Sequence, residues 1–140
     1  MATHYLIDSS ALWRMMRNEA VRDQWHEETK ARLISLCPLV EIEMFFGVRC
    51  PRERREWRDL FHAMFGWVFI PDRVYERAIQ TQELMIELGQ HRCASPVDLL
   101  VAATGELNGL TILHYDRDYE TIAKVTGQPV EWLAPPGSLN

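Results

Sequence analysis

Short apolar runs separated by helical segments constrain the fold of this chain more than any other feature. The runs occupy residues 4–7, 36–40, 67–70, 111–114 and 130–133. Between them, apolar residues recur three or four positions apart, which is the spacing of amphipathic helices. Strands that alternate with helices form a largely parallel sheet covered on both faces. The sequence therefore predicts an α/β three-layer sandwich whose central sheet has about five mainly parallel strands.

Seven helices are expected between and after these strands. They are one directly after Asp8, one over 19–34, one that carries Ile42, Phe45 and Phe46 on one face, one from Pro51 to Phe65, one over 72–90, one from Ser95 to Gly109, and a short one from about Tyr119 to Val125.

The length of 140 residues fits one domain, residues 1–140, with a core over about 3–133 and a frayed tail from Ala134. Three cysteines without a C-x-x-C motif favour a reducing compartment. No apolar run approaches about 18 residues, and the N-terminus lacks the pattern of a signal peptide. We therefore expect a cytoplasmic protein that does not enter a membrane.

The formal net charge of -5 argues, taken alone, against a polyanionic partner. The location of the negative charge matters more than its sum, because a bound divalent cation inverts the field around an acidic cluster. Among the 15 basic residues only Lys30 and Lys124 are lysines. Arginine binds phosphate with a planar fork, so this bias is compatible with a nucleic-acid partner.

Four acidic residues are predicted to meet at one edge of the sheet. Asp8 and Asp116 follow strands, Glu43 lies in the first turn of the helix after the second strand, and Asp98 lies in the first turn of the Ser95 helix. Functional sites of such sheets lie beyond the carboxyl ends of the strands. Carboxylates gathered there repel one another unless a cation is present, and all-oxygen ligands suit Mg²⁺ or Mn²⁺.

Each acid also has a structural interpretation. Asp8 can cap the first helix, and either Asp116 or Asp118 can cap the helix that follows. Ser95-x-x-Asp98 matches a capping box, which is compatible with a role in the site. Glu41 and Glu43 are about 200° apart on a helix, so only one faces the crevice, and we favour Glu43.

At this point the sequence resembles the PIN-domain ribonucleases, and within them the VapC toxins of bacterial and archaeal toxin–antitoxin pairs. Four blocks carry the resemblance, which covers nearly the whole chain: YLIDSSAL, VEIEMFFG, SPVDLLVAATG and ILHYDRDYETIA. It implies a PIN-like fold and a metal-dependent endoribonuclease toxin that is inhibited by a VapB-like antitoxin and is usually a homodimer.

The resemblance also implies roles for individual residues. The acidic quartet of the family matches Asp8, Glu43, Asp98 and Asp116. A further acidic position that varies among members matches Asp118, and Ser10 matches a small hydroxyl residue that lies beside the metal in relatives. We expect Asp8, Asp98 and Asp116 to be the ligands of Mg²⁺ or Mn²⁺ and Glu43 to orient or deprotonate the attacking water.

Two arginines on the helix after Asp8 are expected to contact RNA or the antitoxin. These are Arg14 and Arg17, which are better placed than the four arginines of residues 52–58. We interpret residues 52–58 as a solvated helix face with ion pairs between residues three or four positions apart.

Other functional classes fit the sequence less well. A phosphoacceptor domain needs adjacent acids after the first strand, whereas Ser9 follows Asp8. A phosphatase with an aspartate nucleophile needs a second aspartate where Ser10 stands, and no G-x-G-x-x-G motif for a dinucleotide is present. The remaining alternative is a catalytically silent PIN-fold protein that binds a partner or RNA.

Overall fold

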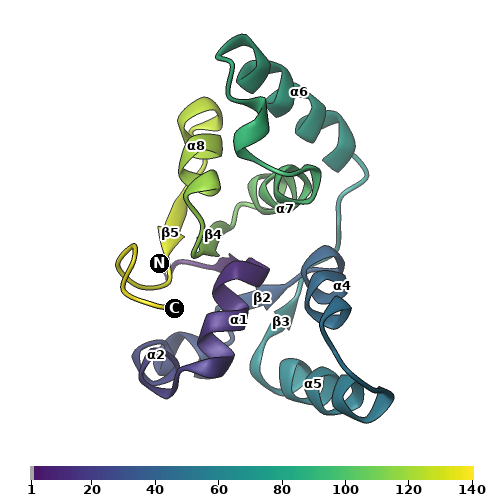
Figure 1. The fold of residues 1–140 in the computed structure, drawn as a ribbon, viewed down its shortest axis with the longest axis vertical. Helices are drawn as coiled ribbons and strands as arrows, with labels where there is room; N and C mark the ends of the chain where they lie inside the picture. Colours follow the sequence, from purple (N-terminus) through teal and green to yellow (C-terminus); the bar gives the residue numbers. More distant parts are fainter. Residues whose placement is uncertain (1) are drawn as a thin grey trace.

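The computed structural model describes residues 2–140, which form a five-stranded parallel sheet with helices on both sides (Figure 1). The order of the strands in the sheet is β3-β2-β1-β4-β5. Their bounds are β1 (Tyr5–Ile7), β2 (Ile34–Leu36), β3 (Gly66–Trp67), β4 (Thr111–His114) and β5 (Val130–Trp132). Tyr5 of the central strand pairs with Ile34 on one side and with Thr111 on the other. The predicted α/β fold is confirmed.

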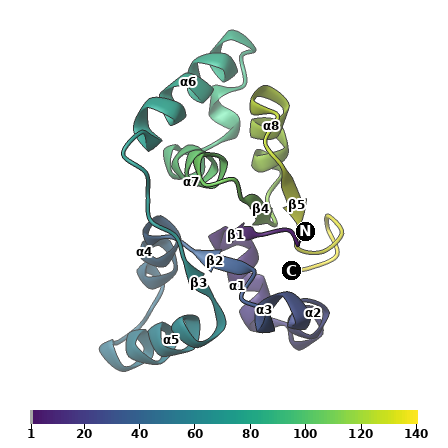
Figure 2. The same cartoon turned by 180° about the vertical axis from the view of Figure 1, so that it is seen from behind.

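Helices connect all five strands and follow the pattern expected for parallel neighbours. They are α1 (Ser9–Arg17), α2 (Glu19–Gln24), α3 (His26–Lys30), α4 (Pro38–Phe46), α5 (Pro51–Met64), α6 (Val74–Glu87), the 3₁₀ turn η1 (His91–Cys93), α7 (Pro96–Leu107) and α8 (Arg117–Thr126). Figures 1 and 2 show α6, α7 and α8 together on one side of the sheet and α1, α2 and α3 on the other. Among residues 2–140, every helix is too short or too polar to span a bilayer.

Strands β1 and β4 form the centre of the core. Leu6 and Ile7 of β1 and Ile112 and Leu113 of β4 are fully buried, because helices cover both faces of the sheet. Gly105 of α7 has a packing role here, since a Cβ atom at this position would collide with the side chain of Ile112. The glycine therefore allows α7 to approach β4 closely.

The second strand lies earlier in the chain than predicted. The apolar run 36–40 is not one strand: β2 ends at Leu36, and α4 begins at Pro38 with Cys37 as its N-cap. Proline suits the first position of a helix, where its missing N–H is not needed. As a result Glu43 lies in the second turn of α4 rather than in the first.

Two helical predictions and one strand prediction also need correction. The expected helix 19–34 is broken at Trp25 into α2 and α3, and the Trp25 indole N–H donates to the Leu133 carbonyl at 2.9 Å. The strand expected at 67–70 is shorter than predicted and begins one residue earlier, at Gly66–Trp67. The predicted apolar face of α4 is wrong, because Ile42 and Phe46 are 68% and 94% exposed while Val40 and Met44 are buried.

The segment after Ala134 is held against the body of the protein rather than frayed. Leu133 and Ala134 are buried. The Leu139 backbone N–H donates to the Tyr115 hydroxyl at 2.7 Å, and the Ser138 hydroxyl donates to the Pro135 carbonyl at 2.6 Å. These bonds fasten the segment beside the turn that follows β4.

Candidate active site

Four acidic side chains from distant parts of the sequence line one cavity. The cavity has a volume of about 370 Å³ and lies at the carboxyl ends of β1, β2 and β4. Its lining includes Asp8, Glu43, Asp98 and Asp116. No lysine or arginine is among the described residues that line it. The structure thus brings together the four acids that the sequence analysis singles out.

Asp8 is the most buried of these acids, with 2% of its surface exposed. It follows β1 directly and caps α1, because its Oδ2 atom accepts from the Ser10 backbone N–H at 3.0 Å. The same oxygen accepts from the Ser10 hydroxyl at 2.6 Å. The Ser10 hydroxyl in turn accepts from the Tyr115 backbone N–H at 3.0 Å, so Ser10 links α1 to the segment after β4.

Asp98 both caps a helix and lines the acidic cavity, which are the two roles predicted for it. It completes a capping box with Ser95 at the start of α7, in which its Oδ2 atom accepts from the Ser95 backbone N–H. Its side chain also faces the acidic cavity. Burial, followed by repulsion from Asp8, raises the pKa of Asp98 to about 6.

Asp116 caps α8 and approaches two neighbouring carboxylates. Its Oδ1 atom accepts from the Asp118 backbone N–H at 2.9 Å. Its own backbone N–H donates to Nδ1 of the buried His114, which fixes the turn. Burial, then the charge of Asp116, raises the pKa of Asp118.

Glu43 enters the cavity from α4, on the opposite side from α7. Its Oε1 atom accepts from the Ser9 hydroxyl at 3.2 Å. Burial and, next, the negative charge of Asp8 raise the pKa of Glu43 to about 7. Glu41 is partly buried and borders a different cavity, so only Glu43 faces the acidic one, as the helical spacing predicts.

The donor set fits a hard divalent cation. One carboxylate oxygen from each of Asp98, Asp116 and Asp118 lies within 4.8 Å of the other two. The pKa values of Asp98 and Glu43 are raised first by burial and then by the charge of Asp8, and a cation in the cavity would offset both effects. This trio includes Asp118, which the sequence analysis ranks as supporting, and does not include Asp8.

Tyr119 is a member of the site that sequence reasoning missed. Its fully buried hydroxyl donates to Asp8 Oδ1 at 2.7 Å and lies 3.4 Å from Asp98 Oδ1. The position one helical turn after the cap residue Asp116 is the one signal that points to it. That signal is weak, because an aromatic residue in an amphipathic helix is ordinarily part of the core.

The two arginines of α1 lie outside the acidic cavity. Arg14 donates through Nη1 to the Ser10 carbonyl at 2.8 Å, and its guanidinium lies 4.5 Å from the centre of the Tyr115 ring. The Arg17 guanidinium lies 4.7 Å from the Trp13 ring centre. Both arginines line a separate cavity beside the C-terminal segment. Arg14 is therefore partly committed to internal contacts, whereas Arg17 has the more accessible charge.

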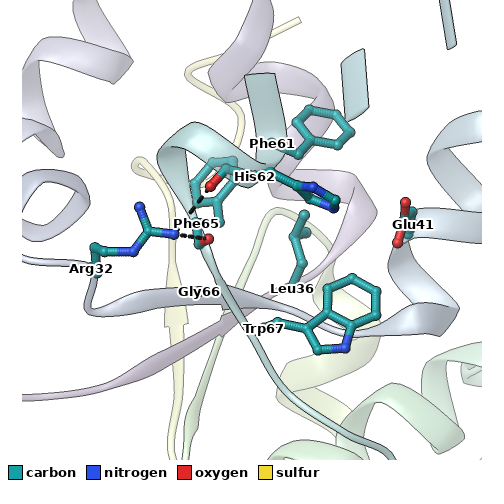
Figure 3. A pocket seen from close by; sticks show the side chains of 8 residues that line it. All are labelled: Arg32, Leu36, Glu41, Phe61, His62, Phe65, Gly66 and Trp67. Atoms are coloured by element: carbon teal, nitrogen blue, oxygen red, sulfur yellow. Dashed lines mark hydrogen bonds between the residues drawn. The ribbon is translucent and has the colours of Figure 1, made fainter. Parts of the chain in front are cut away.

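A larger cavity, of about 550 Å³, lies at the edge strand β3 and is lined mainly by apolar and aromatic residues (Figure 3). On its rim, the Arg32 side chain donates to the carbonyl oxygens of His62, Ala63 and Phe65. These bonds satisfy the carboxyl end of α5. Because this cavity holds no cluster of acids, we place the candidate active site in the smaller cavity.

Comparisons with known proteins agree with this geometry. The PIN domain family model matches residues 5–125. Ribonuclease VapC21 of Mycobacterium tuberculosis is 35% identical over 138 residues, which cover 99% of each chain. Ribonuclease VapC2 of the same species is 36% identical over 137 residues, which cover 96% of each chain.

Solved structures of toxin–antitoxin complexes share the fold. A chain of DNA-bound VapBC from Salmonella typhimurium superposes with a TM-score of 0.78 at 14% identity, over 95% of this chain and 100% of that one. A chain of VapBC-1 from nontypeable Haemophilus influenzae gives a TM-score of 0.75 at 9% identity, over 94% and 98% of the two chains.

Proposed function

This chain belongs to the PIN domain family, and from that premise we propose that it is a metal-dependent endoribonuclease toxin of the VapC type. Its relatives at 35% and 36% identity are named ribonucleases, and the match covers almost the whole length of each. The observation that carries the proposal is the convergence of Asp8, Glu43, Asp98 and Asp116 on one cavity. Such a cluster provides the all-oxygen environment that phosphodiester hydrolysis with Mg²⁺ or Mn²⁺ requires.

Asp8, Asp98 and Asp116 are the proposed ligands of the cation, with Asp118 in support. The spacing of the Asp98, Asp116 and Asp118 oxygens supports Asp98 and Asp116 as ligands, and two bonds from Ser10 hold Asp8 Oδ2 beside the same cavity. A bound Mg²⁺ or Mn²⁺ supplies charge stabilisation at the phosphodiester and lowers the pKa of a coordinated water.

Glu43 is the proposed general base. Its pKa of about 7 lies near physiological pH, which is where a general base is most effective. Because Ser9 donates to Oε1, we assign proton uptake from the attacking water to Oε2. In the overall reaction the water oxygen bonds to phosphorus, one P–O ester bond breaks, and the leaving oxygen takes up a proton.

The partners follow from the same premise. We propose that RNA is the substrate, that a VapB-like antitoxin inhibits the protein, and that Arg17, with Arg14, contacts one of them. The solved VapBC complexes support the antitoxin. The exposed apolar side chains of Tyr75, Ile79 and Ile86 on α6 support a homodimer. Such a protein would meet both RNA and antitoxin in the cytoplasm.

Cleavage of total RNA by the purified chain tests the proposed function. We expect Mg²⁺- or Mn²⁺-dependent fragments that disappear in excess EDTA. Asp8→Asn keeps a side-chain oxygen that can cap α1 but removes the charge, so it should lower the rate at least about a hundredfold with the fold retained. Undiminished cleavage in EDTA, or by this variant, would overturn the proposal. A folded wild type that cuts no RNA would favour the silent binding protein instead.

A further inference from the structure

The Tyr119 side chain is placed at the junction of two site acids rather than simply in the core. Its ring is buried in α8 and packs against His114, with 5.3 Å between ring centres. Its hydroxyl is 2.7 Å from Asp8 Oδ1 and 3.4 Å from Asp98 Oδ1. A buried phenol needs a hydrogen-bond partner, and here its acceptors are two carboxylates from different elements.

The geometry gives the hydroxyl proton one main acceptor. A phenol has a single proton, so the shorter distance assigns it to Asp8, with Asp98 as the weaker second acceptor. A phenol ordinarily loses its proton only at about pH 10, so the hydroxyl carries its proton at neutral pH. The hydroxyl thus remains a donor to the acids.

Resting on the proposed function, we propose that Tyr119 is a positioning residue that holds Asp8 and Asp98 in the arrangement that binds the divalent cation. Without the cation the two carboxylates repel each other, and a shared donor between them offsets part of that repulsion. With the cation bound, the same bond fixes the orientation of Asp8.

The contacts of Asp8 explain why its orientation depends on Tyr119. Ser10 supplies two donors to Oδ2, which leave the carboxylate free to tilt about that oxygen. The Tyr119 hydroxyl is the donor on Oδ1 and completes a three-point hold. An ionised carboxylate oxygen has two lone pairs, so Oδ1 retains one for a cation.

Tyr119→Phe tests this inference because it removes the hydroxyl and keeps the ring. Mn²⁺ binding to the whole chain is measured by calorimetry after dialysis against EDTA and removal of the chelator. We expect the Mn²⁺ dissociation constant to rise about tenfold or more, the effect typical of losing a hydrogen bond to a metal ligand. An unchanged dissociation constant in a folded variant would overturn the inference.

Tyr5→Phe is the matched control. Tyr5 is also a buried tyrosine, but its hydroxyl lies near Glu131 and its ring contacts Trp25 at 5.4 Å between centres. This variant should bind Mn²⁺ as the wild type does. An equal loss of Mn²⁺ affinity in both variants would mean that the effect is a general consequence of a destabilised core, and it would overturn the inference.

Kinetics separates this inference from the proposed function. At subsaturating Mn²⁺, Tyr119→Phe should lower kcat with little change in the KM for RNA, and added Mn²⁺ should restore part of the loss. If the wild type binds Mn²⁺ but cuts no RNA, the proposed function fails, while the binding comparison still decides the role of Tyr119. A loss confined to KM would overturn that role.

If Tyr119→Phe does not fold, an NMR measurement on protein that retains Tyr119 tests the inference. The chain has 4 tyrosines, and their hydroxyl-bearing carbons can be labelled with ¹³C. Phenylalanine variants of Tyr5, Tyr75 and Tyr115 assign the remaining signal to Tyr119. That signal should shift as diamagnetic Mg²⁺ is added, and a signal that stays constant while Mg²⁺ binds would overturn the inference.

Discussion

The Ser9 hydroxyl donates to Glu43 Oε1 at 3.2 Å, which ties the first turn of α1 to the second turn of α4. This bond opposes the two effects that raise the pKa of Glu43, namely burial and the charge of Asp8. Ser9 therefore helps to keep the proposed general base ionised.

Ser9→Ala should move the acidic limb of the pH–rate profile to higher pH. Without the hydroxyl, the pKa of Glu43 rises further, so a smaller fraction of the protein carries the ionised base at a given pH. Cleavage rates measured at fixed Mg²⁺ across the neutral range check this. Ser138→Ala, in the C-terminal segment, is the control, and an acidic limb that coincides with that of the wild type would contradict the role of Ser9.

The stability of the cation-free protein should fall as pH rises from about 4.5 to 7 through the contribution of Glu43. Its pKa is about 7 in the folded state, above the ordinary glutamate value of 4.5, so the folded state binds the proton more tightly and loses this advantage as the proton leaves. Because Glu43 is only partly buried, the contribution is about 1–2 kcal/mol.

Urea unfolding in EDTA at several pH values measures this effect. Glu43→Gln should flatten the decrease in the free energy of unfolding, whereas Glu41→Gln, on the same helix but facing a different cavity, should leave its slope unchanged. Parallel curves for the wild type and Glu43→Gln would contradict this, because they would mean that the pKa of Glu43 is the same in the folded and unfolded states.

Gly105→Ala should lower the free energy of unfolding by about 1–3 kcal/mol, the usual cost of inserting a methyl group into a packed core. The added Cβ would meet the Ile112 side chain between α7 and β4. Ile112→Val shortens that side chain at the point of collision, so the double variant should be more stable than the two single changes predict by addition. Strictly additive losses would contradict the proposed collision.

Arg17→Glu should weaken RNA binding and reduce the slope of log affinity against log salt. The Arg17 side chain stacks on Trp13 near the acidic cavity, so its charge is available to a phosphate. Arg52→Glu provides the comparison, because Arg52 lies on the rival basic surface of α5, where it pairs with Glu56 at 3.7 Å. A reduced slope for Arg52→Glu alone would transfer the RNA contact to α5.

Local sequence patterns were sufficient to predict the sheet, because strands and helices alternate along the chain. They also predicted that four acids meet at one edge of the sheet, because each lies at the end of a strand or near the start of a helix. Asp8 and Asp116 follow strands that become neighbours at the centre of the sheet, and Asp98 lies in a capping box visible in the sequence. Family resemblance and topology thus agree on the same side chains.

One error arose where a local helix signal was outweighed by an apolar run, and the others arose where tertiary contacts overrode the local pattern. The apolar run after Leu36 reads equally well as a buried strand, and Pro38 at the first helical position is what converts it into α4. The break at Trp25 is accompanied by an indole bond to Leu133, more than a hundred residues away. Tyr119 was missed for the same reason, since its acceptors Asp8 and Asp98 are distant in sequence.

Strand β1 is the first to be synthesised but lies at the centre of the sheet, so the proposed active site is complete only after later segments have been made. Its partner β4 and the helix that carries Tyr119 are made after all of α1 to α7, and only β5 and the C-terminal segment follow them. A nascent or prematurely terminated chain that stops before Asp116 lacks this acid together with the Tyr119 bond that holds Asp8. The proposed active site is therefore complete only when translation is almost finished, and we expect chains truncated before this point to lack nuclease activity.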